Sequence, residues 1–251
     1  MSRKHIFSFD DPRQPQTSLG DSAMRICAIS GIIQKYDLDA LIIPHKGPVL
    51  LPLWRRAFGG RVLQDEADIP ESHWDATISR PTARDSYYGN HAWTVFEYVW
   101  WEMGFFKTHN MWIAPPVLYR CDVTSKAAMV YPTEYTEGNR VYTAAWWYTT
   151  LTLLLEKGYA INILGNAEPF CRDLPHRQFP ATIEGLEQCI AASSLAIGGS
   201  TGPTWACLLS DIPQIVLDSR RSIHGTWFFD RCQCVLAKRL RNASTLESLL
   251  I

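Results

Sequence analysis

Short apolar runs with the length of β-strands alternate along the chain with segments whose apolar residues recur at helical spacing. One example is "AINILG" at residues 160–165, which precedes the helical pattern "TIEGLEQCIAAS" at residues 182–193. Strands that alternate with helices of this length predict parallel sheets joined by right-handed crossovers. The other expected strands cover residues 5–10, 40–45, 61–64, 75–79, 126–132, 195–199 and 213–218, and the other expected helices cover 21–36, 48–58, 87–104, 139–157 and a short turn from 201.

Two such series of strands and helices stand on either side of an irregular stretch that contains two consecutive prolines. We therefore expect an α/β protein of two Rossmann-like domains, whose parallel sheets face a central cleft. The predicted boundaries are residues 1–110 for the N-terminal domain, 111–125 for the linker and 126–251 for the C-terminal domain. Ligands of such folds bind at the carboxyl ends of the strands, so the loops that follow the strands are where a site is expected.

The composition is that of an ordinary globular protein and restricts the function. The 24 lysines and arginines against 25 aspartates and glutamates argue against strong nonspecific binding to nucleic acid. Seven cysteines, with no CxxC pair, indicate reduced and mostly buried thiols in a cytoplasmic protein. We expect no integral membrane segment, because no apolar run is long enough to span a bilayer. The histidines lack metal-ligand spacing, so no metal site is expected.

The stretch "SLGD" at residues 18–21 follows the first expected strand and opens the first expected helix. In a parallel α/β protein this strand-to-helix junction is where ligands bind. Asp21 has two interpretations on its residue type and place. It is either a capping carboxylate that stabilises the helix or an acidic group that takes part in chemistry.

A second loop, "GGSTGP" at residues 198–203, follows the apolar strand at residues 195–199. Its glycines allow the backbone to approach a ligand closely, and a helix that begins near Thr201 presents N–H groups that favour phosphate. Ser200 and Thr201 add hydroxyl donors. The loop is neither a P-loop nor a GxGxxG fingerprint, because no Lys-Ser/Thr pair follows it and its glycine spacing differs. The alternative interpretation is a capped helix after a buried strand.

Taken together, "SLGD" and the later "STGPTWA" resemble motifs of glycosyltransferase family 9, which contains the ADP-heptose:lipopolysaccharide heptosyltransferases. The order, spacing and context of the motifs match over most of the chain. The stretch "IEGLEQCIAASSLAIGG" is similar to the helix and strand that precede the second loop in that family. The resemblance implies a GT-B fold, with an acceptor site in the N-terminal domain and a nucleotide-sugar donor site in the C-terminal domain.

The resemblance also implies roles for single residues. Asp21 matches the family's catalytic carboxylate, which would act as general base on the acceptor hydroxyl, while Ser18 and Gly20 would shape the loop beside the donor. Two positions depart from the family, because Ser200 stands in place of an aspartate and Trp205 in place of a histidine. The residues expected to bind the donor diphosphate are Ser200, Thr201, Gly202 and Pro203.

Other loops supply further candidate contacts to donor or acceptor. Arg140 stands nearest to the lysine of the family's "K-r-W-p" motif, and His45 ends an expected strand on its ligand edge. For each candidate, a structural or solvent-exposed role is the alternative. The full set is His45, Thr133, Glu134, Arg140, Trp205 and Arg220.

These observations predict an inverting, metal-independent glycosyltransferase that moves a hexosyl, heptosyl or pentosyl group from a nucleotide-diphosphate sugar to a hydroxyl. No cofactor is expected beyond this co-substrate. The expected acceptor is a glycan of the lipopolysaccharide type or a hydroxylated DNA base. The alternatives are a sugar-nucleotide epimerase, which would need a second carboxylate across the cleft, and a non-catalytic protein that binds nucleotide sugars on the same scaffold.

Overall fold

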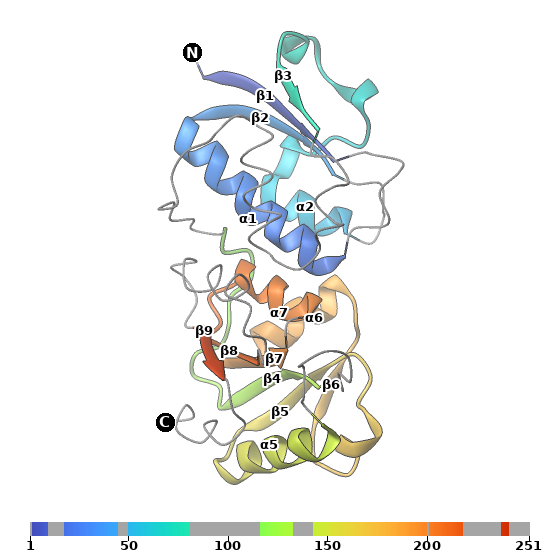
Figure 1. The fold of residues 1–251 in the computed structure, drawn as a ribbon, viewed down its shortest axis with the longest axis vertical. Coiled ribbons are helices and arrows are strands. Elements are labelled where there is room, and N and C mark those ends of the chain that lie inside the picture. Colours follow the sequence, from blue (N-terminus) through green and yellow to red (C-terminus); the bar gives the residue numbers. More distant parts are fainter. Residues whose placement is uncertain are drawn as a thin grey trace.

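The structure, a computed structural model, describes residues 2–9, 18–44, 50–80, 116–132, 143–199, 201–217 and 237–240. Two parallel sheets lie one above the other in Figure 1, with helices between them. The α/β class with two parallel sheets is therefore confirmed. The aromatic helix expected at residues 87–104 lies outside the described residues.

The first sheet has the order β2-β1-β3 within the described residues. Both pairings are parallel, since Ile6 of β1 lies in register with Leu41 of β2 and with Ile78 of β3. Helices α1 and α2 lie on the side of this sheet that faces the second half of the chain (Figure 1). The elements are β1 (Arg3–Ser8), α1 (Leu19–Tyr36), β2 (Leu38–Ile43), α2 (Leu51–Phe58) and β3 (Thr77–Ser79).

The second sheet has the order β6-β5-β4-β7-β8-β9, and each pairing is again parallel. Met129 of β4, near the middle of the sheet, lies in register with Asn162 of β5 and Ala196 of β7. The elements are β4 (Ala127–Tyr131), α5 (Ala144–Glu156), β5 (Ala160–Leu164), β6 (Arg177–Phe179), α6 (Ile183–Ala191), β7 (Leu195–Gly199), α7 (Gly202–Ala206), β8 (Gln214–Leu217) and β9 (Ala237–Leu240).

One expected strand is absent from its predicted place, and two strands were not expected. At residues 61–64, the structure has a 3-10 turn over Gly59–Arg61 and then a single bridge from Val62 to Ile42. The side chain of Asp65 accepts a hydrogen bond from the N–H of Ala67 and begins a new 3-10 helix, so the chain leaves the sheet there. The unexpected strands β6 and β9 are only three and four residues long, which is too short for a clear apolar pattern.

The helix ends follow the residues that prefer such positions. Thr143 and Thr182 cap α5 and α6, because their side-chain oxygens accept hydrogen bonds from the N–H groups of Trp146 and Gly185. Gly158 has φ +80° just after α5, as expected for a glycine that ends a helix. Within the described residues, the helices are too short or too polar to cross a membrane.

One hydrophobic core runs through both halves of the chain. It joins Ile29 of α1 and Trp54 of α2 to Leu186 of α6 and Trp205 of α7. Helices α6 and α7 cover the face of the second sheet that looks toward the first half, and α5 covers the opposite face (Figure 1). An apolar interface of this kind disfavours free relative motion of two halves.

An ion pair also links the halves. Arg56 of α2 forms a two-pronged contact with the carboxylate of Glu187 on α6, with Nη2 2.6 Å from Oε1. The Arg56 guanidinium lies 4.7 Å from the ring centre of Tyr119, which is 1% exposed. Hydrogen bonding to Glu187 is the main reason that the pKa of Arg56 is raised. The contact therefore ties α2, α6 and the segment before β4 together.

The segment around Tyr119 falls in the predicted linker and packs on the second half. The N–H groups of Leu118 and Tyr119 donate to the carbonyl oxygen of Leu209, at 2.7 and 3.1 Å. The carboxylate of Asp211 accepts from the N–H of Cys121 at 2.8 Å. The domain boundaries at residues 110 and 125 stay a prediction.

The thiols of the described cysteines are free, and four of the five are buried, as expected. Burial raises the pKa of the Cys189 thiol to about 12 and that of the partly exposed Cys121 thiol to about 11. Both thiols are protonated at neutral pH, and the buried Cys189 acts as an apolar core group. The five are Cys27, Cys121, Cys171, Cys189 and Cys207.

His5, in the middle of the first sheet, should make stability depend on pH. Burial, with the charge of Arg3 as second cause, lowers the pKa of His5 from 6.5 to about 4. The unfolded chain therefore takes up a proton that the folded chain refuses, so stability is full above pH 6.5 and is lost as pH falls toward 4. We expect this residue to reduce the free energy of unfolding by about 3 kcal/mol over that interval.

Urea titrations at several pH values measure this effect. His5→Gln should flatten the slope of the unfolding free energy against pH, whereas the control His176→Gln should keep it. An equal slope in wild type and His5→Gln would contradict the assignment.

Candidate active site

The two stretches singled out in the sequence lie against each other at the starts of α1 and α7. A Cβ atom on Gly20 would lie 3.1 Å from Cδ1 of Trp205 and 3.4 Å from Cα of Gly202. A Cβ atom on Gly202 would lie 3.3 Å from Cβ of Leu19 and 3.5 Å from the backbone nitrogen of Gly20. A side chain at either position would therefore push its neighbours apart by a few tenths of an ångström. Residues about 180 positions apart in the chain thus form one constellation.

The start of α1 places Asp21 inside the helix. The carbonyl oxygen of Ser18 accepts the first helical hydrogen bond, from the N–H of Ser22 at 3.0 Å. Ser18 is therefore the N-cap residue, and Asp21 is the third residue of α1, which begins at Leu19. The interpretation of Asp21 as the N-cap is thus not the one the backbone adopts. A carboxylate in the first turn of a helix still interacts favourably with the helix dipole.

The second stretch forms a turn at residues 201–204, after β7. Thr201 has an extended backbone, and its N–H donates to the carbonyl oxygen of Gly199 at 2.8 Å. Pro203 has no N–H, so the N–H groups of this turn that lack an intrahelical acceptor are those of Gly202 and Thr204. Because α7 is only five residues long, its dipole adds less to anion binding than the sequence suggested.

The hydroxyl groups of Thr201 and Thr204 contact each other on the side of this turn that faces β7. Oγ1 of Thr201 lies 3.3 Å from Oγ1 of Thr204, and both residues are buried. A Cβ atom on Gly198 would lie only 2.6 Å from Oγ1 of Thr204. Glycine at position 198 therefore gives the Thr204 hydroxyl its room, and the two hydroxyls form a small polar group behind the turn.

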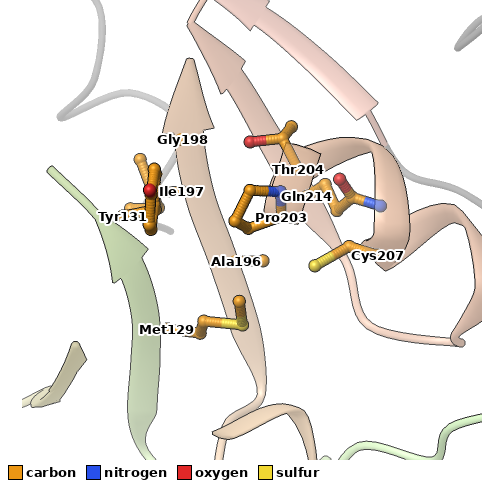
Figure 2. A pocket seen from close by; sticks show the side chains of 9 residues that line it. All are labelled: Met129, Tyr131, Ala196, Ile197, Gly198, Pro203, Thr204, Cys207 and Gln214. Carbon is orange, nitrogen blue, oxygen red and sulfur yellow. The ribbon is translucent and has the colours of Figure 1, made fainter. Parts of the chain in front are cut away.

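A small pocket with room for about one water molecule lies between α7 and the second sheet. Figure 2 shows the side chains of Pro203, Thr204 and Gln214 on one side and those of Met129 and Tyr131 on the other. Gln214 is 1% exposed, and neither atom of its amide has a hydrogen-bond partner within the described residues. A buried amide without partners is costly, so this group is suited to a polar atom that enters the pocket.

Trp205 lies in the core against Gly20, with 8% of its surface exposed. Of the other residues expected at the site, Gly202 meets Gly20 at the contact just described. Ser18 and the backbone of Asp21 flank this contact on the α1 side, and Thr201 and Pro203 flank Gly202 on the α7 side. The side chain of Asp21 is outside the described part of the structure. The same holds for the whole of His45, Thr133, Glu134, Arg140, Ser200 and Arg220.

Sequence reasoning missed Gln214 and the role of Gly198. The signal for Gln214 was a single amide in the otherwise apolar strand "QIVL". A polar residue in a buried strand needs a partner, and that partner points to a site. Within the described part of the chain, no three His, Cys, Asp or Glu side chains gather as a metal site would require.

Comparison with solved structures defines the fold. The E. coli heptosyltransferase WaaC with ADP-2-deoxy-2-fluoro heptose matches with a TM-score of 0.60 and 11% identity, over 98% of each chain. The chain has the heptosyltransferase fold. A glycosyl transferase of family 9 from Veillonella parvula also shares it, with a TM-score of 0.55, 11% identity, and coverage of 98% of this chain and 88% of that one.

A third protein with the heptosyltransferase fold is described as an iron-containing dodecameric glycosyltransferase, TibC of enterotoxigenic E. coli. It matches with a TM-score of 0.56 and 11% identity, over 90% of this chain and 65% of TibC. No protein-family model matches the sequence, and the comparison with curated proteins found no match. The likeness therefore lies in the fold, as the resemblance in the motifs had implied.

Proposed function

We propose that the protein is an inverting glycosyltransferase that moves a sugar from a nucleoside-diphosphate donor to a hydroxyl of a glycan acceptor. The observation that supports this most is the contact between the starts of α1 and α7 in a chain with the heptosyltransferase fold. It puts a carboxylate-bearing turn beside a turn whose N–H groups lack intrahelical acceptors. General base and leaving-group donors are the two parts that glycosyl transfer requires.

In this proposal Asp21 takes the proton from the acceptor hydroxyl as that oxygen attacks the anomeric carbon of the donor. The new bond joins the acceptor oxygen to the anomeric carbon, and the bond from that carbon to the diphosphate oxygen breaks with its electron pair. The diphosphate leaves from the face opposite to the attack, so the configuration is inverted. The N–H groups of Gly202 and Thr204 stabilise its developing charge.

We also propose that this transfer needs no metal ion, because backbone donors and hydroxyls take the place of a cation at the diphosphate. TibC, a glycosyltransferase with the same fold, is iron-containing, so the metal requirement of this protein has to be measured. Transfer should keep its rate in excess EDTA. A loss that added divalent cation restores would contradict metal independence and leave sugar transfer in place.

Nucleotide binding is the first test. We expect a nucleoside diphosphate from the set ADP, UDP and GDP, at 100 times its Kd, to raise the melting temperature by roughly 5–10 °C. Thr201→Val, which removes the hydroxyl beside Thr204, should at least halve this shift at the same concentration. Gly202→Ala is a poor probe, because the added carbon would crowd Leu19 at 3.3 Å.

The matched control is Thr150→Val, which changes the same atoms at a buried position on α5, on the far side of the second sheet. Its nucleotide shift should equal that of wild type. A shift with none of the three nucleotides would contradict the proposed function. Transfer to glycan fractions, compared with hydroxylated DNA, then tests the acceptor.

A further inference from the structure

Trp205 lies between the two turns of the proposed site. It is the fourth residue of α7, three positions after Gly202, and its ring lies against Gly20, the residue before Asp21. The Cβ and Cδ1 atoms of Trp205 lie 3.4 and 3.1 Å from where a Cβ of Gly20 would be. The indole of Trp205 therefore connects the two turns, because it belongs to α7, which begins in the 201–204 turn, and contacts the first turn of α1, which contains Asp21.

Further interactions hold the residues on either side of the contact between Gly20 and Trp205. Leu19 and Gly20 pack on Gly202, and the N–H of Trp205 donates to the carbonyl oxygen of Thr201 at 3.0 Å. Helix α7 has only five residues and runs directly into a buried 3-10 turn, Cys207–Leu209. So short an element has little stability of its own. Its place relative to α1 depends on its packing, and Trp205 is the largest side chain that it packs.

A second observation concerns the side of this helix that faces the second sheet. The pocket that Pro203 and Thr204 line also contains the buried amide of Gln214, which has no partner within the described residues (Figure 2). A water molecule in this space would pair with the amide of Gln214 directly behind the 201–204 turn. The position of α7 therefore sets both this polar space and the 201–204 turn.

We propose that Trp205 is a positioning residue, whose indole, packed on Gly20, sets the 201–204 turn against the start of α1 in the geometry that binds the donor diphosphate. This rests on the proposed function. Trp205 touches no phosphate itself and acts through Gly202 and Thr204. It stands where the resembling family has histidine, so the larger ring shapes a site particular to this chain. A displacement of the turn by about 1 Å is enough to weaken such a site about 100-fold.

Two pairs of variants separate positioning from ordinary core packing. Gly20→Ala adds one carbon 3.1 Å from the indole, and its control Gly60→Ala adds one carbon with no atom within 4 Å. Trp205→Phe shortens the ring at the contact, and its control Trp54→Phe shortens another ring of the same core, 2% exposed. The measurements are the melting temperature and the Kd for ADP, UDP and GDP by calorimetry.

We expect both tryptophan variants to melt earlier than wild type. For the nucleotide that wild type binds best, Kd should rise at least tenfold in Gly20→Ala and Trp205→Phe. In Gly60→Ala and Trp54→Phe it should change less than twofold. If Trp205→Phe does not fold, Gly20→Ala still decides, because it removes nothing from the core.

The failures are distinct. Wild type that binds a nucleotide while Gly20→Ala and Trp205→Phe bind it equally well overturns the positioning role and leaves the proposed function standing. A Kd that rises as much in Trp54→Phe as in Trp205→Phe also overturns it, since general loss of stability then explains both. Wild type that binds none of the three nucleotides overturns the proposed function and this inference together.

Discussion

Asp21→Asn is expected to lower the rate of sugar transfer by about 10²- to 10⁴-fold. Asparagine has nearly the shape of aspartate but cannot accept the proton of an attacking hydroxyl. Asp21 is the third residue of α1, one position after the glycine that touches Trp205, so the substitution leaves that contact intact. The melting temperature and the Kd for the nucleotide should therefore stay close to those of wild type. The rate is measured as nucleoside-diphosphate release from sugar donors that carry the nucleotide identified in the binding screen.

The matched control is Asp75→Asn. Asp75 is an exposed carboxylate that binds Nζ of Lys4 at 3.0 Å and precedes β3, so it lies at the amino edge of the first sheet. The start of α1 follows the carboxyl end of β1, at the other edge. Asp75→Asn should leave the transfer rate within twofold of wild type. A wild-type rate in Asp21→Asn would sink the role of general base.

Gly185→Ala is expected to produce the largest loss of stability among glycine substitutions in the described part of the chain. A Cβ atom there would lie 1.9 Å from the carbonyl oxygen of Pro180, and both groups are backbone or attached directly to it. The overlap cannot be relieved by a side-chain rotation, so the first turn of α6 has to move. Thr182, which caps that turn by accepting the N–H of Gly185 at 3.0 Å, would lose its bond. We expect a cost of about 3 kcal/mol.

Urea unfolding measures this cost as a lower midpoint with an unchanged slope. Gly60→Ala is the control, because nothing lies within 4 Å of its added carbon. At such a position, alanine reduces the entropy of the unfolded chain and should leave stability unchanged or raise it by up to about 1 kcal/mol. A Gly185→Ala protein as stable as wild type would mean that the first turn of α6 differs from the structure.

The strands and helices with a strong pattern were predictable. The run "AINILG" forms β5, and the glycine expected to end the helix before it has φ +80° at position 158. The elements that were predicted wrongly or not at all are short segments. β6 has three residues, of which two are exposed, and the residues expected as a strand at 61–64 form a turn and one bridge. A segment of three or four residues has too few positions for a period to show.

The candidate site was predictable in part. Both turns could be predicted because each combines glycine with a carboxylate or hydroxyl groups directly after an apolar strand. Residue type and backbone conformation are local properties, so a short stretch of sequence is enough to recognise them. The helix begins earlier than predicted, with Ser18 as its N-cap. Asp21 is therefore the third residue of the helix and does not cap it. Gln214 was hidden in an apolar strand, because its lack of partners is visible only when its neighbours are known.

The residues and their order along the chain were enough to determine the α/β class, the parallel strands and the positions of the two turns of the candidate site. These features depend on the spacing of apolar residues, every two residues in strands and every 3.6 in helices, and on the places of glycines. Both can be recognised from residues close together in the sequence. The tertiary structure decided that Gly20 meets Trp205, that Gly202 meets Leu19, and that Arg56 joins Glu187 across the two halves. Those contacts join residues more than 130 positions apart. They depend on how whole helices pack on a shared core, which no local pattern records.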